Sequence, residues 1–258
     1  MSPPSLDDRV IVIAGVGGGL GPVVASRLAE AGAIVAGTDR DQGALDSLAS
    51  ELAIPEDRWD GRAVDLLDED AARTWCAALV ERFGRVDALI HLVGGWRGGE
   101  PLHEAPLADW DLLHDLLVRT VQHTTRAFHD QLAASEHGRF VLVSAKQAQH
   151  PTNTNAAYAA AKAAAEAWTL ALADGFATSA ADGPETSAIP TESARRPAGA
   201  ATANIVVVDA ILTPRMRADN PGKDFPTFTP AEHIAEAIAF LCSDAAAKMN
   251  GQRLALHP

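Results

Sequence analysis

Short apolar runs alternate with longer amphipathic stretches along most of the chain. The apolar runs are rich in Val, Ile and Ala, and their length suits strands that are buried on both faces of a sheet. The pattern predicts strands near 9–14, 33–38, 61–65, 86–93, 138–144, 204–208 and 252–256, with helices filling most of the gaps. This alternation is typical of a parallel sheet that is covered by helices.

Two segments depart from the alternation. Residues 178–203 are rich in Ala, Ser, Thr, Pro and Gly and lack apolar periodicity, which predicts a flexible insertion between a helix and the next strand. That connection lies at the amino-terminal edge of a parallel sheet, away from the ligand-binding edge. Residues 213–229 instead follow a strand and contain several prolines and a glycine, so they are predicted to form a substrate lid.

Length and composition narrow the classes of protein that fit. The 258 residues fit one domain, 1–258, and the formal net charge of −13 argues against nucleic acid or an anionic membrane as partner. Cys76 and Cys242 lack the spacing of a disulfide framework or a zinc site, and the histidines show no metal-ligand pattern, so we expect no metal. The chain shows neither a signal peptide nor an uncharged run of roughly 20 residues, so a soluble, cytoplasmic protein is expected.

A glycine-rich turn follows the first apolar run. Residues 14–21 read Ala-Gly-Val-Gly-Gly-Gly-Leu-Gly, with Gly15, Gly19 and Gly21 in a G-x-x-x-G-x-G spacing. Such a turn lets backbone amides approach a pyrophosphate at the positive end of the next helix. We therefore expect these glycines and Leu20 to bind a dinucleotide. The fold predicted is a single doubly wound (Rossmann) parallel sheet of about seven strands with helices on both faces.

The ends of the next two strands indicate which dinucleotide binds. Asp39 ends the second strand, where a carboxylate accepts hydrogen bonds from the adenosine ribose and repels a 2′-phosphate. The adjacent Arg40 could instead receive that phosphate, so NAD(H) is preferred and NADP(H) is the alternative. Asp39 could also cap the helix of 41–53. Asp65 and Leu66 are expected at the adenine, although capping the helix that starts near Asp68 is a rival role for the local acids.

Tyr158 and Lys162 lie four residues apart at the start of a long alanine-rich helix, so a phenol and an ammonium share one helix face. Together with Ala14–Gly21, they give the chain a resemblance to the short-chain dehydrogenase/reductase family. The resemblance implies that Tyr158 is the general acid/base and that Lys162 lowers its pKa and binds the nicotinamide ribose. It further implies cofactor contacts by Gly94, Gly95 and Thr213, and a homodimer or homotetramer.

The chain departs from the pattern of this family at several positions. Ala145 occupies the usual serine position, with Ser144 one residue early, and Leu117 occupies the usual asparagine position. His91-Leu-Val-Gly94 replaces Asn-Asn-Ala-Gly, and Val208-Asp209 replaces Pro-Gly. These departures argue against ordinary alcohol oxidation.

Four segments resemble the dihydropteridine reductase-like branch of the family: Gly94-Gly-Trp-Arg-Gly-Gly99, Ser144-Ala-Lys146, Thr213-Pro and Phe228-Thr-Pro230. That resemblance implies a strongly electrophilic quinonoid dihydropterin as substrate, which accepts hydride without a serine. We expect Trp96, Lys146 and Met216 to contact the substrate, Trp96 by stacking on a flat heterocycle. Alternatively, Trp96 closes the core beneath its loop.

The function predicted is an NAD(P)H-dependent oxidoreductase that transfers hydride to a planar electrophilic acceptor while Tyr158, assisted by Lys162, handles the proton. One alternative is a short-chain carbonyl/alcohol dehydrogenase that uses a shifted Ser144 as a third catalytic residue. The other is a cofactor-binding protein with little turnover.

Overall fold

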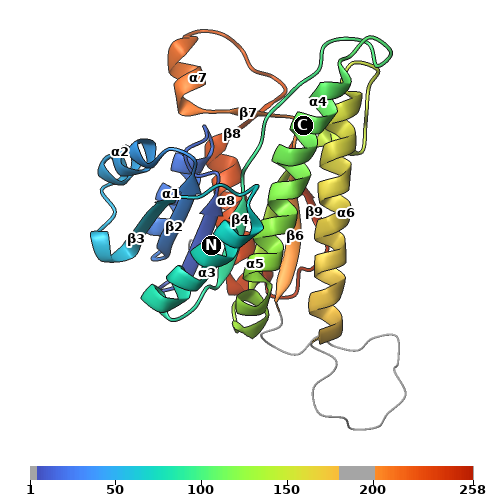
Figure 1. The fold of residues 1–258 in the computed structure, drawn as a ribbon. Helices are drawn as coiled ribbons and strands as arrows, with labels where there is room; N and C mark the ends of the chain where they lie inside the picture. The colour runs from blue at the N-terminus through green and yellow to red at the C-terminus, as the bar shows by residue number, and fades with distance from the viewer. Residues whose placement is uncertain (1–4, 180–200, 258) are drawn as a thin grey trace.

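The computed structural model describes residues 5–179 and 201–257. Seven parallel strands form one sheet in the order β3-β2-β1-β4-β5-β6-β9 (Figure 1). Their bounds are β1 Val10–Ala14, β2 Ile34–Asp39, β3 Trp59–Ala63, β4 Ala88–His91, β5 Arg139–Ala145, β6 Thr202–Val208 and β9 Arg253–Ala255. The predicted doubly wound parallel sheet is confirmed, with each of the seven predicted strands present.

Helices cover both faces because side chains along each strand alternate between them. In β1, Ile11 and Ile13 pack against α1 (Gly21–Glu30), α2 (Gln42–Leu52) and α8 (Ala231–Cys242). Val10 and Val12 pack on the opposite face, in the core that contains α3 (Glu69–Phe83), α5 (Thr120–Ala134) and α6 (Ala156–Ser179).

The order of the strands reverses between β1 and β4, which places a crevice at the carboxyl ends of these two strands. Gly15 continues from β1, Leu92 follows β4, and the backbone amide of Leu92 donates to the carbonyl of Ala14. The glycine-rich turn and the segment after β4 are therefore held side by side at this edge.

Polar side chains fix where α2 and α3 start. Asp41 caps α2 by accepting from the amides of Gly43 and Ala44. Asp68 caps α3 in the same way through Asp70 and Ala71. Both acids therefore satisfy amides that the first helical turn leaves without partners.

Two features were not predicted from the pattern. A small second sheet pairs β7 (Ala210–Leu212) with β8 (Phe228–Pro230), and a π-helical turn at Asp115–Arg119 joins α4 (Leu107–His114) to α5. The predicted lid 213–229 connects the two strands of the small sheet and contains α7 (Pro214–Asp219), which projects beyond the main sheet in Figure 1.

The predicted insertion at 178–203 lies mostly outside the described residues. Its described ends belong to regular elements, because α6 continues to Ser179 and β6 begins at Thr202. Among the described helices, none combines the length and the apolar character needed to cross a bilayer.

Candidate active site

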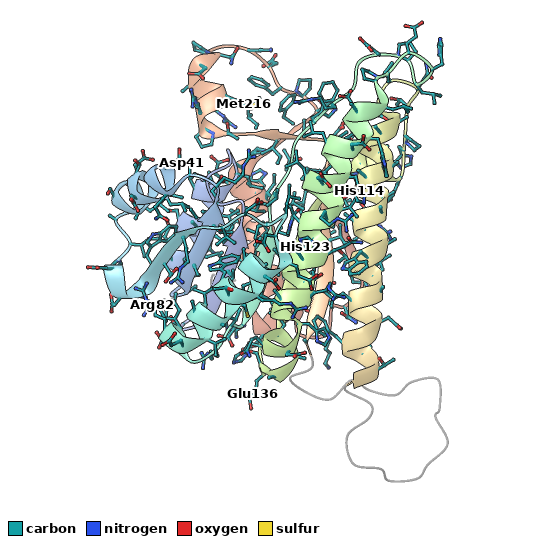
Figure 2. The ribbon with its side chains drawn as sticks, viewed as in Figure 1. Asp41, Arg82, His114, His123, Glu136 and Met216 are labelled. Atoms are coloured by element: carbon teal, nitrogen blue, oxygen red, sulfur yellow. The ribbon has the colours of Figure 1, made fainter. Side chains whose placement is uncertain are left out.

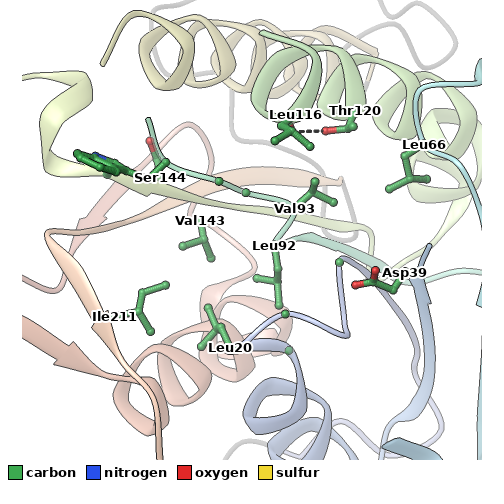
Figure 3. A pocket seen from close by; sticks show the side chains of 18 of the residues that line it. Leu20, Asp39, Leu66, Leu92, Val93, Leu116, Thr120, Val143, Ser144 and Ile211 are labelled. Carbon is green, nitrogen blue, oxygen red and sulfur yellow. Dashed lines mark hydrogen bonds between the residues drawn. The ribbon is translucent and has the colours of Figure 1, made fainter. Parts of the chain in front are cut away.

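A cavity of about 710 Å³ lies at the carboxyl edge of the sheet and is lined from both sides of the β1/β4 crevice (Figure 3). This volume falls within the usual range of ligand pockets. Most of the residues predicted for the site line it: Gly15, Gly19, Leu20, Gly21, Asp39, Arg40, Asp65, Leu66, Gly94, Gly95, Trp96, Ser144, Tyr158 and Lys162.

Three predicted residues are not part of the cavity wall. Lys146 lies in the turn after β5, and Met216 is carried away from the sheet by α7 (Figure 2). Thr213 caps α7 by accepting from the amide of Met216 at 3.2 Å. Its methyl group lies 3.1 Å from where a side chain on Gly19 would begin, so Thr213 contacts the glycine-rich turn rather than the cavity.

The glycine-rich turn approaches its neighbours so closely that two positions require glycine. Gly15 has a φ of +84°, and a Cβ there would lie 2.8 Å from the backbone nitrogen of Val93. A Cβ on Gly21 would lie 2.0 Å from the carbonyl oxygen of Val16. Leu20 and Gly21, at the start of α1, line the cavity, and no side chain caps the helix there. The amide of Gly21 donates to the carbonyl of Gly18 at 3.0 Å, so the turn folds back on itself at this point. This cradle fits a pyrophosphate.

Asp39 both shapes the turn and lines the cavity. Its carboxylate accepts from the amide of Gly17 at 3.1 Å and from that of Arg40 at 2.7 Å. The alternative role of Asp39 as a helix cap is excluded, because Asp41 caps α2. The Asp39 carboxylate and the exposed Arg40 both line the end of the cavity that would hold an adenosine ribose.

The acids after β3 divide their roles in a similar way. Asp68 caps α3, whereas Asp65 lines the cavity and accepts from the amide of Leu67 at 3.0 Å. Leu66 also lines the cavity and is 7% exposed. Leu66 therefore offers an apolar surface and Asp65 a hydrogen-bond acceptor, a combination that suits a flat base.

Tyr158 and Lys162 lie on one face of α6 and line the cavity at the end of β5. The ammonium of Lys162 donates to the carbonyl of Val143 at 2.9 Å. Burial lowers the pKa of Lys162 to about 8, an effect that the nearby Glu166 carboxylate opposes. Burial also raises the pKa of Tyr158 to about 12. At neutral pH the phenol therefore carries its proton and the lysine is mostly charged.

The hydroxyl of Ser144 is committed to a buried carboxylate. Ser144 Oγ donates to Glu166 Oε1 at 2.7 Å, and both residues are 1% exposed. The other oxygen of Glu166 accepts from Arg253 Nε at 2.7 Å and from Gln149 Nε2 at 3.3 Å. With its proton directed at Glu166, this hydroxyl cannot also donate to a substrate oxygen.

His91 is buried beside the charge of Lys162. Burial lowers the pKa of the imidazole to about 3, with a smaller contribution from Lys162, and the backbone of Thr120 opposes the shift. Neither ring nitrogen has a hydrogen-bond partner among the described residues. His91 is therefore neutral over the physiological range and lacks the bonded partners that a buried imidazole usually has.

The π-helical turn brings two further side chains to the cavity. Leu116 and Thr120 line it, and the Thr120 hydroxyl donates to the carbonyl of Leu116 at 2.7 Å (Figure 3). Leu117, at the family's asparagine position, is 1% exposed in a small apolar cluster that Tyr158 packs against. The side chain of Leu117 cannot supply the polar group that an asparagine would.

Trp96 lies at the rim of the cavity and is 57% exposed. It does not close the core beneath its loop, which was the alternative to a stacking role. An exposed indole at the cavity rim is available to a planar ligand.

Sequence analysis did not identify Glu166, Thr120, Gln147 or Asp209 as site residues. Glu166 had a usable signal, because an acid four residues after Lys162 shares its helix face. Asp209 was noted only as a departure from Pro-Gly. It lines the cavity and accepts from Gln147 Nε2 at 2.9 Å.

The two cysteines are free and buried, and burial raises the pKa of Cys76 to about 11 and that of Cys242 to about 12. The described part of the chain contains no group of three or more His, Cys, Asp or Glu residues that could hold a metal ion.

Residues 9–180 match the short chain dehydrogenase family. Cis-4-hydroxycyclohexanecarboxylate dehydrogenase of Sinomonas cyclohexanicum is 30% identical over 96% of this chain and 95% of its own length. Another relative, peroxisomal multifunctional enzyme type 2 of Mus musculus, is also 30% identical, but this chain matches only 23% of its length.

Solved structures share the fold. A 3-ketoacyl-(acyl-carrier-protein) reductase from Brucella melitensis, complexed with NADH, superposes with a TM-score of 0.77 at 24% identity and 98% coverage of both chains. A short chain dehydrogenase from Shigella flexneri, complexed with NADP, gives a TM-score of 0.81 at 21% identity and 99% coverage of both chains. With its parallel sheet, its glycine-rich turn and its Tyr158–Lys162 pair at one cavity, this chain belongs to the short-chain dehydrogenase/reductase family of oxidoreductases.

Proposed function

We propose that this protein is an NAD(P)-dependent dehydrogenase that interconverts a secondary alcohol and the corresponding carbonyl compound, with NAD(H) as the preferred cofactor. The observation that carries the proposal is the placement of Tyr158 and Lys162 in one cavity with the glycine-rich turn. The names of the relatives support an alcohol or carbonyl substrate better than a dihydropterin.

The residues of the cavity fit a dinucleotide. The uncapped start of α1 and the close approach at Gly15 and Gly21 suit a pyrophosphate, and Asp39 suits the ribose hydroxyls of the adenosine half. When bound, a nicotinamide would supply the hydride acceptor or donor. NADP(H) remains the alternative, with Arg40 as the group that would bind its 2′-phosphate.

Tyr158 moves the proton in this proposal. In carbonyl reduction, the carbonyl carbon gains a hydride and the oxygen takes the phenolic proton, which gives the alcohol. In oxidation, the same phenolate oxygen receives the hydroxyl proton. The pKa of about 12 keeps Tyr158 protonated at neutral pH, which suits the reductive direction. The charged Lys162 stabilises the phenolate that proton donation leaves behind.

Ser144 is poorly placed to act as a third catalytic residue. Because its hydroxyl donates to Glu166, the shifted-serine version of the alternative has no free donor in this structure. The same observation favours a second candidate substrate, a planar acceptor such as a quinonoid dihydropterin, which accepts hydride without a serine. Tyr158 and Lys162 serve both candidates.

Proposed with the function are a cytoplasmic location, in keeping with the two free, buried cysteines, and a homodimer or homotetramer. On α4, Leu107, Trp110 and Leu112 are 87%, 37% and 39% exposed, and such residues would suit a contact between subunits.

The test is a screen of NADH oxidation and NAD⁺ reduction with small ketones, secondary alcohols and quinonoid dihydropterin. Tyr158→Phe should reduce kcat by about 10²- to 10⁴-fold on any active substrate, because it removes the proton donor. Ser144→Ala should change kcat by less than about threefold, because its hydroxyl does not reach the substrate. Tight NADH binding without turnover of any compound would refute the proposal and favour a cofactor-binding protein.

A further inference from the structure

Asp209 lies at the catalytic end of the cavity. It follows β6 directly and lines the same cavity as Tyr158 and Lys162. In the pairing of β5 with β6, Val208 lies opposite Ala145, the position at which the family carries its serine. A carboxylate thus stands one residue beyond the place where a catalytic hydroxyl is missing.

A neighbouring amide holds one oxygen of this carboxylate. Gln147 Nε2 donates to Asp209 Oδ1 at 2.9 Å, and the two residues are 62 positions apart in the chain. The amide oxygen of Gln147 is buried and has no hydrogen-bond partner among the described residues. Rotating the amide would turn its oxygen toward the carboxylate, so electrostatics fixes the orientation. Orienting Asp209 in this way leaves the amide oxygen of Gln147 without a partner, which costs free energy.

No cation neutralises Asp209 within the described residues. It takes part in none of the salt bridges there, and the ammonium of Lys162 donates to the carbonyl of Val143 instead. Asp209 is partly buried, and Gln147 provides its one hydrogen bond among the described side chains. A partly buried carboxylate with an unoccupied oxygen is stabilised by a further donor, and an open cavity wall leaves that donor to a ligand.

The charge of this group also restricts what can bind. A carboxylate accepts hydrogen bonds and donates none, so it favours a ligand hydroxyl over a ligand carbonyl or carboxylate. Inside a cavity of low polarity, two like charges repel more strongly than they do in water. A substrate that carries a carboxylate near its reacting carbon would therefore meet repulsion at Asp209.

We propose that Asp209, oriented by Gln147, is a specificity-determining residue that accepts a hydrogen bond from a second hydroxyl group of a neutral polyol or hydroxyketone and selects against carboxylate substrates. This inference rests on the proposed dehydrogenase function and deepens it by naming the class of substrate. The chemistry of oxidation or reduction is unchanged, because Asp209 acts on the substrate group that does not react.

Three substrates of similar size test the proposal: trans-cyclohexane-1,2-diol, cyclohexanol and trans-2-hydroxycyclohexanecarboxylate. The wild-type protein should prefer the diol to the carboxylate in kcat/KM. Asp209→Asn removes the charge with little change in volume. It should lower kcat/KM for the diol by about tenfold and raise it for the carboxylate by about tenfold, while cyclohexanol changes by less than about threefold. Gln147→Leu, which releases the carboxylate, should raise KM for the diol with a smaller effect on kcat.

Control measurements separate substrate recognition from other roles. Glu51→Gln removes the same charge from an exposed position on α2 and should leave all three kcat/KM values unchanged. Dissociation constants for NAD⁺ and NADH, measured by fluorescence titration, should be the same in the wild-type protein and Asp209→Asn. Equal losses on all three substrates, or a changed NAD⁺ to NADH affinity ratio, would overturn the proposal because Asp209 would then act on the cofactor or the fold.

Failure of the proposed function gives a different result. If no substrate is turned over, the ligand-induced rise in Tm of the NADH-loaded protein still compares the diol with the carboxylate. A larger rise with the diol that Asp209→Asn abolishes would support recognition without catalysis, and equal rises would refute it. If the protein preferred trans-2-aminocyclohexanol to the diol by more than about tenfold in kcat/KM or in affinity, the proposed neutral substrates would be wrong and cationic amino alcohols would replace them.

Discussion

At the scale of single residues, Asp39 serves two functions with one carboxylate. One oxygen holds the amide of Gly17 in the glycine-rich turn, and the group also lines the cavity where an adenosine ribose would lie. Substitution by alanine would remove the charge and the turn contact together. Asn keeps one acceptor oxygen, which can serve the amide of Gly17, and removes the charge together with the acceptor that the amide of Arg40 uses. It therefore tests the charge with less disturbance of the turn than alanine.

We expect Asp39→Asn to narrow the preference for NADH over NADPH by about tenfold or more, because it removes repulsion of the 2′-phosphate. Fluorescence titrations with the two cofactors measure the ratio of dissociation constants. Arg40→Ala is the matched variant and should widen the preference, because the exposed guanidinium attracts that phosphate. A wild-type protein that binds NADPH more tightly would show that Arg40 outweighs Asp39.

His91 predicts a dependence of stability on pH. The pKa of the imidazole is about 3 in the folded protein and 6.5 as an ordinary value, so the unfolded chain binds more protons between these two pH values. The contribution of neutral His91 to the free energy of unfolding therefore has its full value above pH 6.5 and falls as the pH decreases. Relative to His91→Leu, the wild-type protein should lose about 2 kcal/mol more between pH 7 and pH 5.

Urea unfolding at the two pH values measures this difference. His233→Gln, at an exposed position on α8, is the control and should behave like the wild-type protein. Parallel pH dependences for the wild-type protein and His91→Leu would mean that the imidazole is solvated or bonded in solution.

At the scale of elements, the sequence predicted the strands well and their ends less well. Continuous aliphatic runs fix a buried parallel strand, so all seven appear near their predicted positions. The third strand occupies Trp59–Ala63 rather than 61–65, because the chain leaves the sheet once Asp65 and Asp68 begin to bond turn and helix amides. The pairing of β7 with β8 had no local signal, since each contributes only three residues.

The candidate site was predictable where local motifs carry the chemistry. Glycine spacing identified the turn at one end of the cavity, and the Tyr158–Lys162 pair identified its catalytic end. The pairing of Ser144 with Glu166 and that of Asp209 with Gln147 join different elements, 22 and 62 positions apart in the chain, so no local pattern reveals them. Lys146 was predicted at the substrate from a segment that resembles the dihydropteridine reductase-like branch, and Met216 from its place in the predicted lid, but the turn after β5 and α7 carry them off the cavity wall.

The close packing of the turn between β1 and α1 predicts that Gly21 cannot be replaced by alanine without a loss of stability or of NADH binding. Gly21→Ala should cost several kcal/mol of stability or abolish NADH binding, because its Cβ would lie 2.0 Å from the backbone oxygen of Val16. Gly175, inside α6, has nothing within 4 Å of its Cβ position. Gly175→Ala should therefore stabilise the protein by about 0.5–1 kcal/mol.

Thermal unfolding and NADH titration check both variants. A Gly21→Ala protein with wild-type Tm and NADH affinity would show that the turn relaxes away from this geometry in solution. A destabilised Gly175→Ala protein would show that α6 meets a neighbour at this position.

At the scale of the whole molecule, the cavity lies at one edge of the sheet and the connection between α6 and β6 lies at the opposite edge. The carboxyl edge holds the cavity, with Tyr158 and Lys162 in the first turns of α6. The opposite edge holds the far end of α6 and the start of β6. Lys162 and Thr178 are separated by about 24 Å along the helix axis at the usual rise per residue. The chain beyond Ser179 therefore starts far from the cavity.

Replacing residues 180–200 with a Gly-Ser segment of equal length should therefore leave the NADH dissociation constant and kcat/KM within about twofold of wild type. Trp96→Ala, at the cavity rim, is the positive control and should lower kcat/KM for the same substrate. Circular dichroism and Tm establish that each variant is folded. A replaced segment that abolishes turnover while Tm and dichroism stay native would contradict this prediction and place part of 180–200 at an active site.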